Sequence, residues 1–164
     1  MKEVAMVCAL ILTVSTQAAY GQSSSGNAVP VTVENFIRAE SDLYFGNVVK
    51  EGSFGKFTHR REPAAIDSQT VIRLNRDTLY SSAVFDLDAG PVTITMPDAG
   101  KRFMSLMVVN EAHYVPSVPY DPGRHVFTKE KIGTRYMLAG VRTLVDPADP
   151  KDVTQVHVLQ DGIR

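Results

Sequence analysis

Apolar positions along this chain repeat with two different periods, and the change of period divides the chain into regions. Between residues 33 and 49 they recur every three to four residues, which predicts a helix that Thr32 caps and that stops at Gly52. The apolar stripe of this helix consists of Val33, Phe36, Ile37, Leu43, Tyr44 and Val48, and its one polar member is Glu40. Such a stripe is expected to pack against a sheet.

From residue 70 onward apolar and polar positions alternate, which is typical of half-buried strands separated by turns. The pattern predicts strands at 70–74, 78–87, 91–96, 103–109, 125–128 and 134–144. The segment 103–109 is almost wholly apolar and is expected to be a central strand, whereas Pro116 and Pro119 place the segment 114–118 at a sheet edge. Residues 53–68 show no clear period and are predicted to form a long loop.

A second helix is predicted near the end of the sequence, where Asp149 can serve as the cap and Pro150 as the first helical residue. Its apolar side consists of Val153, Val156 and Leu159. A helix, many short strands and a final helix predict a mainly β sandwich of roughly seven strands with helical ends, spanning residues 32–164.

The first 21 residues have the character of a secretory signal peptide. Lys2 precedes an apolar run at 4–14, and Ala19 and Gly21 supply the small residues of a cleavage site. The run is shorter than a membrane span, and the polar residues that follow predict a flexible leader at 22–31. We therefore expect a periplasmic or secreted protein; a buried N-terminal helix is the alternative.

Composition narrows the function classes. The chain has 17 Lys and Arg against 18 Asp and Glu, and its largest basic group is the pair Arg60-Arg61, which argues against nucleic acid or a membrane surface as partner. No apolar run after the signal peptide is long enough to span a membrane. Cys8 is the only cysteine and would leave with the signal peptide, so disulfides and thiolate chemistry are excluded from the mature chain.

No metal or other cofactor is expected. The four histidines form no close pair in the sequence. A set made of His113, Glu111, His59 and Asp77 is conceivable, but nothing in the spacing requires it.

Several segments together resemble one family. They are Asn-Arg-Asp-Thr-Leu-Tyr-Ser at 75–81, the hairpin at 85–92, and the segments 101–105, 110–114, 133–136 and 156–161. This set is similar to the bacterial exported family known as domain of unknown function 1254. The resemblance implies an immunoglobulin-like β-sandwich with an N-terminal helix and implies no particular activity.

Relatives in that family usually continue beyond the segment corresponding to 156–161, some into a second β domain. We therefore expect a short stand-alone form, a truncated product or one half of a split protein. The partner would be a C-terminal domain or a second copy of the chain.

The best candidate for a functional site is the junction before the strand at 78–87. Asn75, Arg76 and Asp77 lie there with Arg73 before them and Tyr80 after them, and arginines in this arrangement can hold a carboxylate or phosphate. The competing interpretation is ordinary turn chemistry, in which the Asn and Asp side chains bond to the backbone. Tyr114 begins an aromatic and proline-rich stretch suited to a sugar ring or an apolar small molecule.

The sequence favours a non-catalytic module of the cell envelope that binds a ligand or a protein. A small-molecule hydrolase is the alternative, with Asp77 or His113 as catalytic base and the arginines holding an anionic group. That alternative requires Asp77, His113 and an arginine to meet in one pocket.

Overall fold

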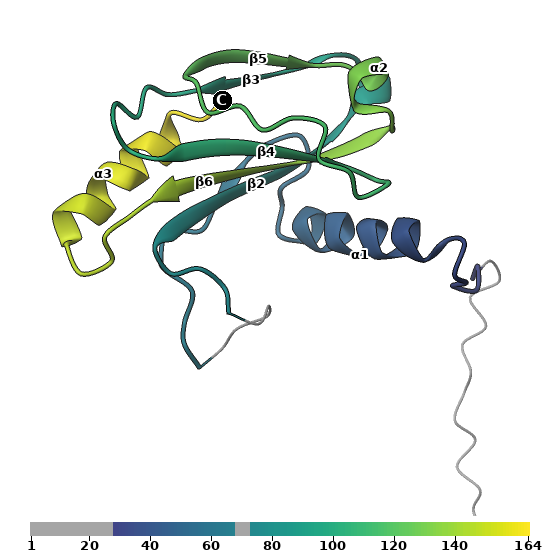
Figure 1. Ribbon diagram of the computed structural model, residues 1–164, viewed down its shortest axis with the longest axis horizontal. Helices are drawn as coiled ribbons and strands as arrows, with labels where there is room; N and C mark the ends of the chain where they lie inside the picture. The colour runs from purple at the N-terminus through teal and green to yellow at the C-terminus, as the bar shows by residue number, and fades with distance from the viewer. Residues whose placement is uncertain (1–27, 68–72) are drawn as a thin grey trace, which may run out of the picture. The chain divides into compact units, whose positions relative to one another are not determined.

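The computed structural model describes residues 28–67 and 73–164 of the chain (Figure 1). The predicted signal peptide, most of the predicted leader and most of the strand predicted at 70–74 lie outside the described residues. The chain divides into a unit of residues Met1–Pro30 and a unit of residues Val31–Arg164, and every helix and strand described here belongs to the second.

Two antiparallel sheets form the centre of this unit. The larger sheet has the order β1-β2-β6-β4, and the smaller one pairs β3 with β5. The strand bounds are β1 Thr58–His59, β2 Thr78–Asp86, β3 Val92–Met96, β4 Met104–Asn110, β5 Gly123–Phe127 and β6 Tyr136–Leu144. Figure 1 shows the two sheets as separate layers, with β3 and β5 above β2, β6 and β4.

The main hydrophobic core fills the space between these layers. Ile94 and Phe127 of the smaller sheet belong to the same cluster as Leu106, Met137 and other buried residues of the larger one. On β6 every second residue is buried, as the two-residue period predicts. Removing such apolar side chains from water contributes about 1.5–3 kcal/mol each, so this layer contact is the main source of stability.

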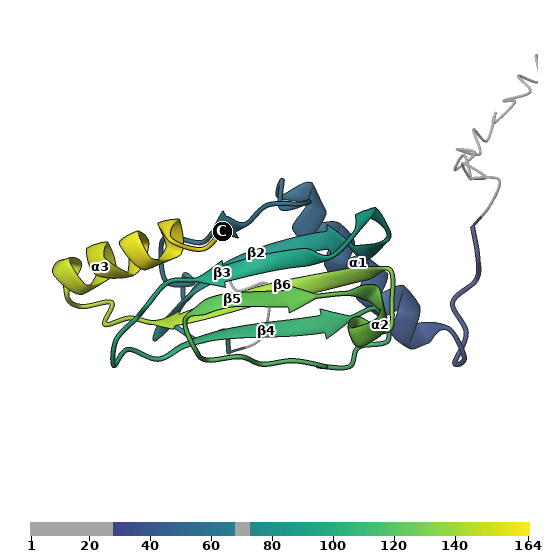
Figure 2. The same ribbon diagram turned by 90° about the horizontal axis from the view of Figure 1, so that it is seen from above.

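Helices occupy the periphery. Helix α1, Phe36–Lys50, lies on the side of the larger sheet away from β3 and β5 (Figures 1 and 2). Helix α3, Pro150–Asp161, follows β6 in the chain and lies at the end of the sheet where β6 ends. A 3-10 turn η1, Leu87–Ala89, and a short helix α2, Lys129–Ile132, lie in the connections. None of the helices within 28–67 and 73–164 combines the length and apolar character that crossing a membrane requires.

Several predictions are confirmed. The protein is mainly β with a helix near each end of the unit, and the helix near the end starts as predicted, because the Asp149 carboxylate accepts a hydrogen bond from the Lys151 N–H at 2.9 Å. Val156 of that helix is fully buried. The segment around Ser117 joins the sheet edge through a bridge to Val108. The immunoglobulin-like type of the sandwich stays a prediction.

Two predictions about the sheet are wrong. Strand β4 is buried as expected, but its ladder partner is β6 alone, and an isolated bridge lies on its other side, so it is not central. An apolar run indicates that both faces of a strand are buried, but it does not indicate how many strands pair with it. The predicted loop at 53–68 contains β1, which is too short to show a period, and Phe54 bridges to Val84 of β2.

The prediction for the face of α1 is also wrong. The residues that this helix buries are Ser41 and Phe45, neither of which belongs to the predicted stripe. The stripe residues Phe36, Ile37 and Tyr44 are about half exposed, at 55%, 56% and 49%. Periodicity shows that a helix has an apolar side, but it does not show which side the rest of the fold covers.

Candidate functional site

The predicted junction before β2 is an exposed segment. Arg73, Asn75, Arg76 and Asp77 are all exposed, and Arg73 has a positive φ of 59°. None of these four side chains forms a hydrogen bond or ion pair with another part of the described chain, so the expected side-chain-to-backbone turn bonds are not formed. The main chain fixes the segment instead, because the Asp77 carbonyl accepts a hydrogen bond from the Val145 N–H at 2.8 Å.

Asp77 and His113 lie toward opposite ends of the larger sheet. Thr78, next to Asp77, pairs with Leu144 of β6, whereas Asn110, near His113, pairs with Met137 at the other end of that strand. Seven residues of strand separate these points, roughly 23 Å at about 3.3 Å per residue. The convergence that the hydrolase alternative requires is therefore not found, and a ligand-binding role for Asp77 stays a prediction.

The conceivable metal set is dispersed in the same way. His59 pairs with Ser81 in the middle of β2, where its Nδ1 lies 2.8 Å from the Ser81 hydroxyl. It therefore lies between the two ends that carry Asp77 and His113. Among the residues that the structure describes, no group of three or more histidine, cysteine or acidic side chains could hold a metal ion.

The turn that follows β4 is held rigidly by the side chain of Asn110. Its Oδ1 accepts hydrogen bonds from the N–H groups of Ala112 and Tyr114, each at 3.0 Å, and its Nδ2 donates to the Ile132 carbonyl at 2.9 Å. This arrangement holds His113 at a positive φ of 62°, which is uncommon for a residue with a side chain. The turn therefore presents Glu111 and His113 to α1 in fixed positions.

Two polar contacts join this turn to α1. The hydroxyl of Ser41, which is fully buried, lies 3.1 Å from Nδ1 of His113. The Glu111 carboxylate, only 6% exposed, forms an ion pair with Arg38 at 2.5 Å and accepts the N–H of Tyr136 at 2.9 Å. Both oxygens of Glu111 are therefore occupied within the protein.

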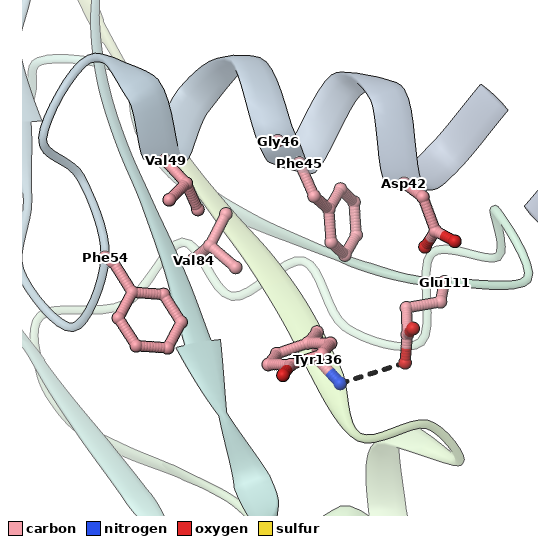
Figure 3. A pocket seen from close by; sticks show the side chains of 8 residues that line it. All are labelled: Asp42, Phe45, Gly46, Val49, Phe54, Val84, Glu111 and Tyr136. Carbon is pink, nitrogen blue, oxygen red and sulfur yellow. Dashed lines mark hydrogen bonds between the residues drawn. The ribbon is translucent and has the colours of Figure 1, made fainter. Parts of the chain in front are cut away.

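A cavity of about 440 Å³ lies between α1 and the outer side of the larger sheet (Figure 3). Its apolar walls are formed by Phe45, Gly46, Val49, Phe54, Val84 and Tyr136. Asp42 and Glu111 lie together at one end, as Figure 3 shows. The site is thus an apolar chamber with carboxylates at one end.

Asp42 is the unoccupied acid of this chamber. It lies one helical turn after Arg38 on α1, and no hydrogen bond or ion pair joins its carboxylate to any residue in the described part of the chain. Partial burial raises the pKa of Asp42, the negative charge of Glu111 raises it further, and Arg38 partly opposes both.

Gly46 forms part of the chamber wall in the interior of α1. A glycine there costs about 1 kcal/mol relative to alanine. Nothing in the described chain requires it, because a Cβ atom built at this position meets no atom within 4 Å. The missing side chain therefore leaves space in the chamber.

A second cavity, of about 380 Å³, lies on another side of the same turn. It is lined by Phe36, Ile37, Glu40, Ala112, His113 and Tyr114. His113 and Tyr114, which are adjacent in the sequence and were proposed for separate reasons, thus line the same cavity, and Glu111 of the conceivable metal set lines the first one. Arg73, Asn75, Arg76, Asp77 and Tyr80 line neither of these two cavities.

Sequence reasoning missed Asp42 and Gly46, although the sequence contains a signal for them. Arg38, Asp42, Gly46 and Val49 recur every three to four residues, so they share one face of the helix. That face is distinct from the apolar stripe, and its mixed composition concealed it.

Comparisons with known proteins agree with the family resemblance. The family model described as "Protein of unknown function (DUF1254)" matches residues 54–117. No curated protein matches the chain. Among solved structures, the chain is similar to the VPA0106 protein from Vibrio parahaemolyticus, with a TM-score of 0.57 and 15% identity over 78% of this chain and 34% of that one. That likeness shows the fold alone, and the chain spans about a third of the length of that neighbour.

Proposed function

We propose that this chain, which matches the DUF1254 family model over residues 54–117, is a non-catalytic domain that binds an apolar small molecule beneath α1. The observation that supports this most strongly is the 440 Å³ chamber with its open wall at Gly46. Its volume falls within the range of roughly 300–1,000 Å³ that is usual for small-molecule sites.

The walls of the chamber favour an apolar guest. Phe54 and Tyr136 meet edge to face with ring centroids 6.5 Å apart, and Phe45 and Val84 add further apolar surface. Each square ångström of apolar ligand surface that these walls remove from water contributes about 25 cal/mol. A guest of this kind would also cover surface on α1 that the chain itself leaves open.

The polar groups of the chamber suit binding better than catalysis. Glu111 has both oxygens occupied and Arg38 is paired with it, so Asp42 is the acid with free oxygens. Hydrolysis generally uses an acid and a base or a nucleophile and a base within reach of one bond. The chamber therefore offers one recognition group rather than a catalytic pair.

The experiment uses n-octanol as the probe and Gly46→Leu as the blocking variant. A leucine at this position fills the chamber without a clash on its Cβ, and Asn47→Leu adds the same side chain at the adjacent exposed position of α1. We expect octanol to bind the wild type and Asn47→Leu in isothermal titration calorimetry and to fail with Gly46→Leu. Equal binding by all three proteins, or no binding by the wild type, would refute the proposal.

A second candidate function is protein binding, and the exposed apolar stripe at the start of α1 and in the turn before it favours it. Val33, Phe36 and Ile37 are 91%, 55% and 56% exposed, and contiguous apolar surface of this kind marks interaction sites. If a second copy of the chain covers the stripe, the molar mass measured by light scattering rises with concentration. Phe36→Ser together with Ile37→Ser would then restore the monomer.

Export is part of the proposed function. The signal-like segment at 1–21 supports a place of action in the periplasm or outside the cell. N-terminal sequencing of protein expressed from the full reading frame tests this, with Gln22 expected as the first residue. An intact Met1 on the purified protein would contradict it.

A further inference from the structure

We infer that the guest of the chamber is a cationic amphiphile, with its apolar tail between α1 and the sheet and a protonated nitrogen held by Asp42. This inference rests on the proposed function and adds the chemical class of the head group. It follows from how the charges at one end of the chamber are distributed.

The charges there do not cancel. Arg38 and Glu111 form a pair at 2.5 Å, and the remaining oxygen of Glu111 accepts the Tyr136 N–H. Asp42 is left without a partner among the described residues, so this end of the chamber carries a net charge of about −1 when all three groups are ionised. Asp42 is exposed, so a cationic head group can reach it from solvent while the tail lies against the apolar walls, and a carboxylate forms its stronger hydrogen bonds with charged donors.

An anionic head group would be excluded for the same reason. It would add a third negative charge beside Asp42 and Glu111. It could recruit Arg38 only by taking it from Glu111, which would leave a buried carboxylate without its ion pair. Arg38 is itself half exposed, but Glu111 is buried and would keep only the Tyr136 N–H as a partner, so a fatty acid is a poor guest.

A neutral hydroxyl head group lies between these cases, because it can donate one hydrogen bond to Asp42 without charge attraction. The aromatic walls do not change this order of affinities among cationic, neutral and anionic head groups. The ring of Tyr136 is already covered by the Arg135 guanidinium at 4.8 Å, so Asp42 supplies the attraction for a cation.

Ionisation of Asp42 makes the selection dependent on pH. Partial burial and Glu111 raise the pKa of Asp42 and Arg38 opposes them, so Asp42 takes up a proton at a higher pH than an ordinary aspartate. The affinity for a cation should therefore fall as the pH is lowered through this range. The affinity for a neutral alcohol should change little.

The test compares three probes with the same tail, n-octylamine, n-octanol and octanoate, by isothermal titration calorimetry on the whole chain. We expect octylamine to bind at least about tenfold more tightly than octanoate at pH 7, with octanol between them. Asp42→Asn should remove the preference for the amine over octanol. Glu40→Gln, which removes a carboxylate on the same helix outside this chamber, is the matched control and should leave the order unchanged.

The outcomes separate this inference from the proposed function. If the three probes bind equally and Gly46→Leu blocks them all, the chamber is a ligand site and the cationic class is wrong. If octanoate binds most tightly, or if Asp42→Asn keeps the preference for the amine, the inference is also overturned. If none of the three binds, the proposed function itself fails.

Discussion

The two longer helices meet the rest of the fold in different ways. Helix α3 closes its contact: Gln160 is fully buried and its amide donates to the carbonyls of Arg60 and Tyr80, at 3.1 and 3.3 Å. Helix α1 leaves its contact open, because its buried residues are a serine and a phenylalanine beside a chamber of about 440 Å³. The contact of α3 is thus filled where Gln160 lies, with a cavity of about 370 Å³ beside it that Arg102 and Gln155 help to line, whereas the space under α1 has mostly apolar walls.

The glycines of the two helices show the same contrast. At Gly162, just after α3, an added Cβ would lie 3.0 Å from the Pro97 Cβ, so glycine permits a close approach. At Gly46, within α1, the added Cβ would meet nothing within 4 Å. Glycine in one place is required by packing and in the other keeps a space, which is the basis of the proposed ligand site.

The largest difference should appear when the buried polar residue of each helix is truncated. Gln160→Ala removes a fully buried amide, takes the side-chain donor from the Arg60 carbonyl and leaves the Tyr80 carbonyl with the Arg60 N–H, so it should lower the free energy of unfolding by about 3 kcal/mol. Ser41→Ala removes one hydroxyl next to the exposed His113 ring and should cost less than about 1 kcal/mol. Urea denaturation of both variants checks this, and equal losses would contradict the contrast.

The ion pair that anchors α3 should give the next effect. Arg102 binds both carboxylate oxygens of Asp152 and donates to the Leu144 carbonyl at 2.7 Å. Arg102→Gln should lower the free energy of unfolding by about 2 kcal/mol. Arg135→Gln breaks a pair with Asp86 in which the arginine is half exposed and should have a smaller effect on the free energy of unfolding, which makes it the control.

This pair also predicts a dependence on pH. The hydrogen bond from Arg102 lowers the pKa of Asp152 from 3.8 to about 2, with help from the Asp146 N–H. Because the folded state has the lower pKa, the stabilisation is complete well above pH 3.8 and is lost as the pH falls toward 2. The stability gap between wild type and Arg102→Gln should therefore narrow over that interval, and a constant gap in urea titrations at several pH values would count against this account.

Alanine at the two glycines should have opposite effects. Gly162→Ala forces a Cβ against the rigid ring of Pro97 and should cost about 1 kcal/mol. Gly46→Ala meets no atom and should raise the free energy of unfolding by about 0.5–1 kcal/mol through helix propensity. Thermal unfolding of the two variants measures whether each substitution raises or lowers the stability. A destabilised Gly46→Ala would show that the chamber wall is already filled.

The smallest effect concerns Asp42. Its raised pKa means that the folded state binds this proton more tightly than the unfolded state, so its contribution to stability falls as the pH rises through its range. Asp42→Asn should therefore stabilise the protein slightly at pH 7, by a few tenths of a kcal/mol, and the gain should disappear in acid. A loss of stability at pH 7 would mean that attraction to Arg38 outweighs burial and Glu111.

The sequence carried enough information for most of the fold, since alternation located β2, β3 and β6 to within two residues and the Asp149–Pro150 signal located α3. It failed for β1, which has two residues and hence no period, and for the stripe of α1, which faces away from the sheet. The site was harder still. His113 and Tyr114, which the sequence singled out, line the second cavity, whereas Asp42 and Gly46 of the chamber depend on which side of α1 meets the sheet, and local periodicity does not contain that information.

Ligand binding beneath α1 is tested most directly by an amide chemical-shift titration of the ¹⁵N-labelled protein with n-octanol. We expect shifts that saturate at Gly46, Phe54 and Tyr136, that are absent near Gly162, and that disappear in Gly46→Leu. Shifts centred on α3, or unchanged shifts in Gly46→Leu, would contradict it.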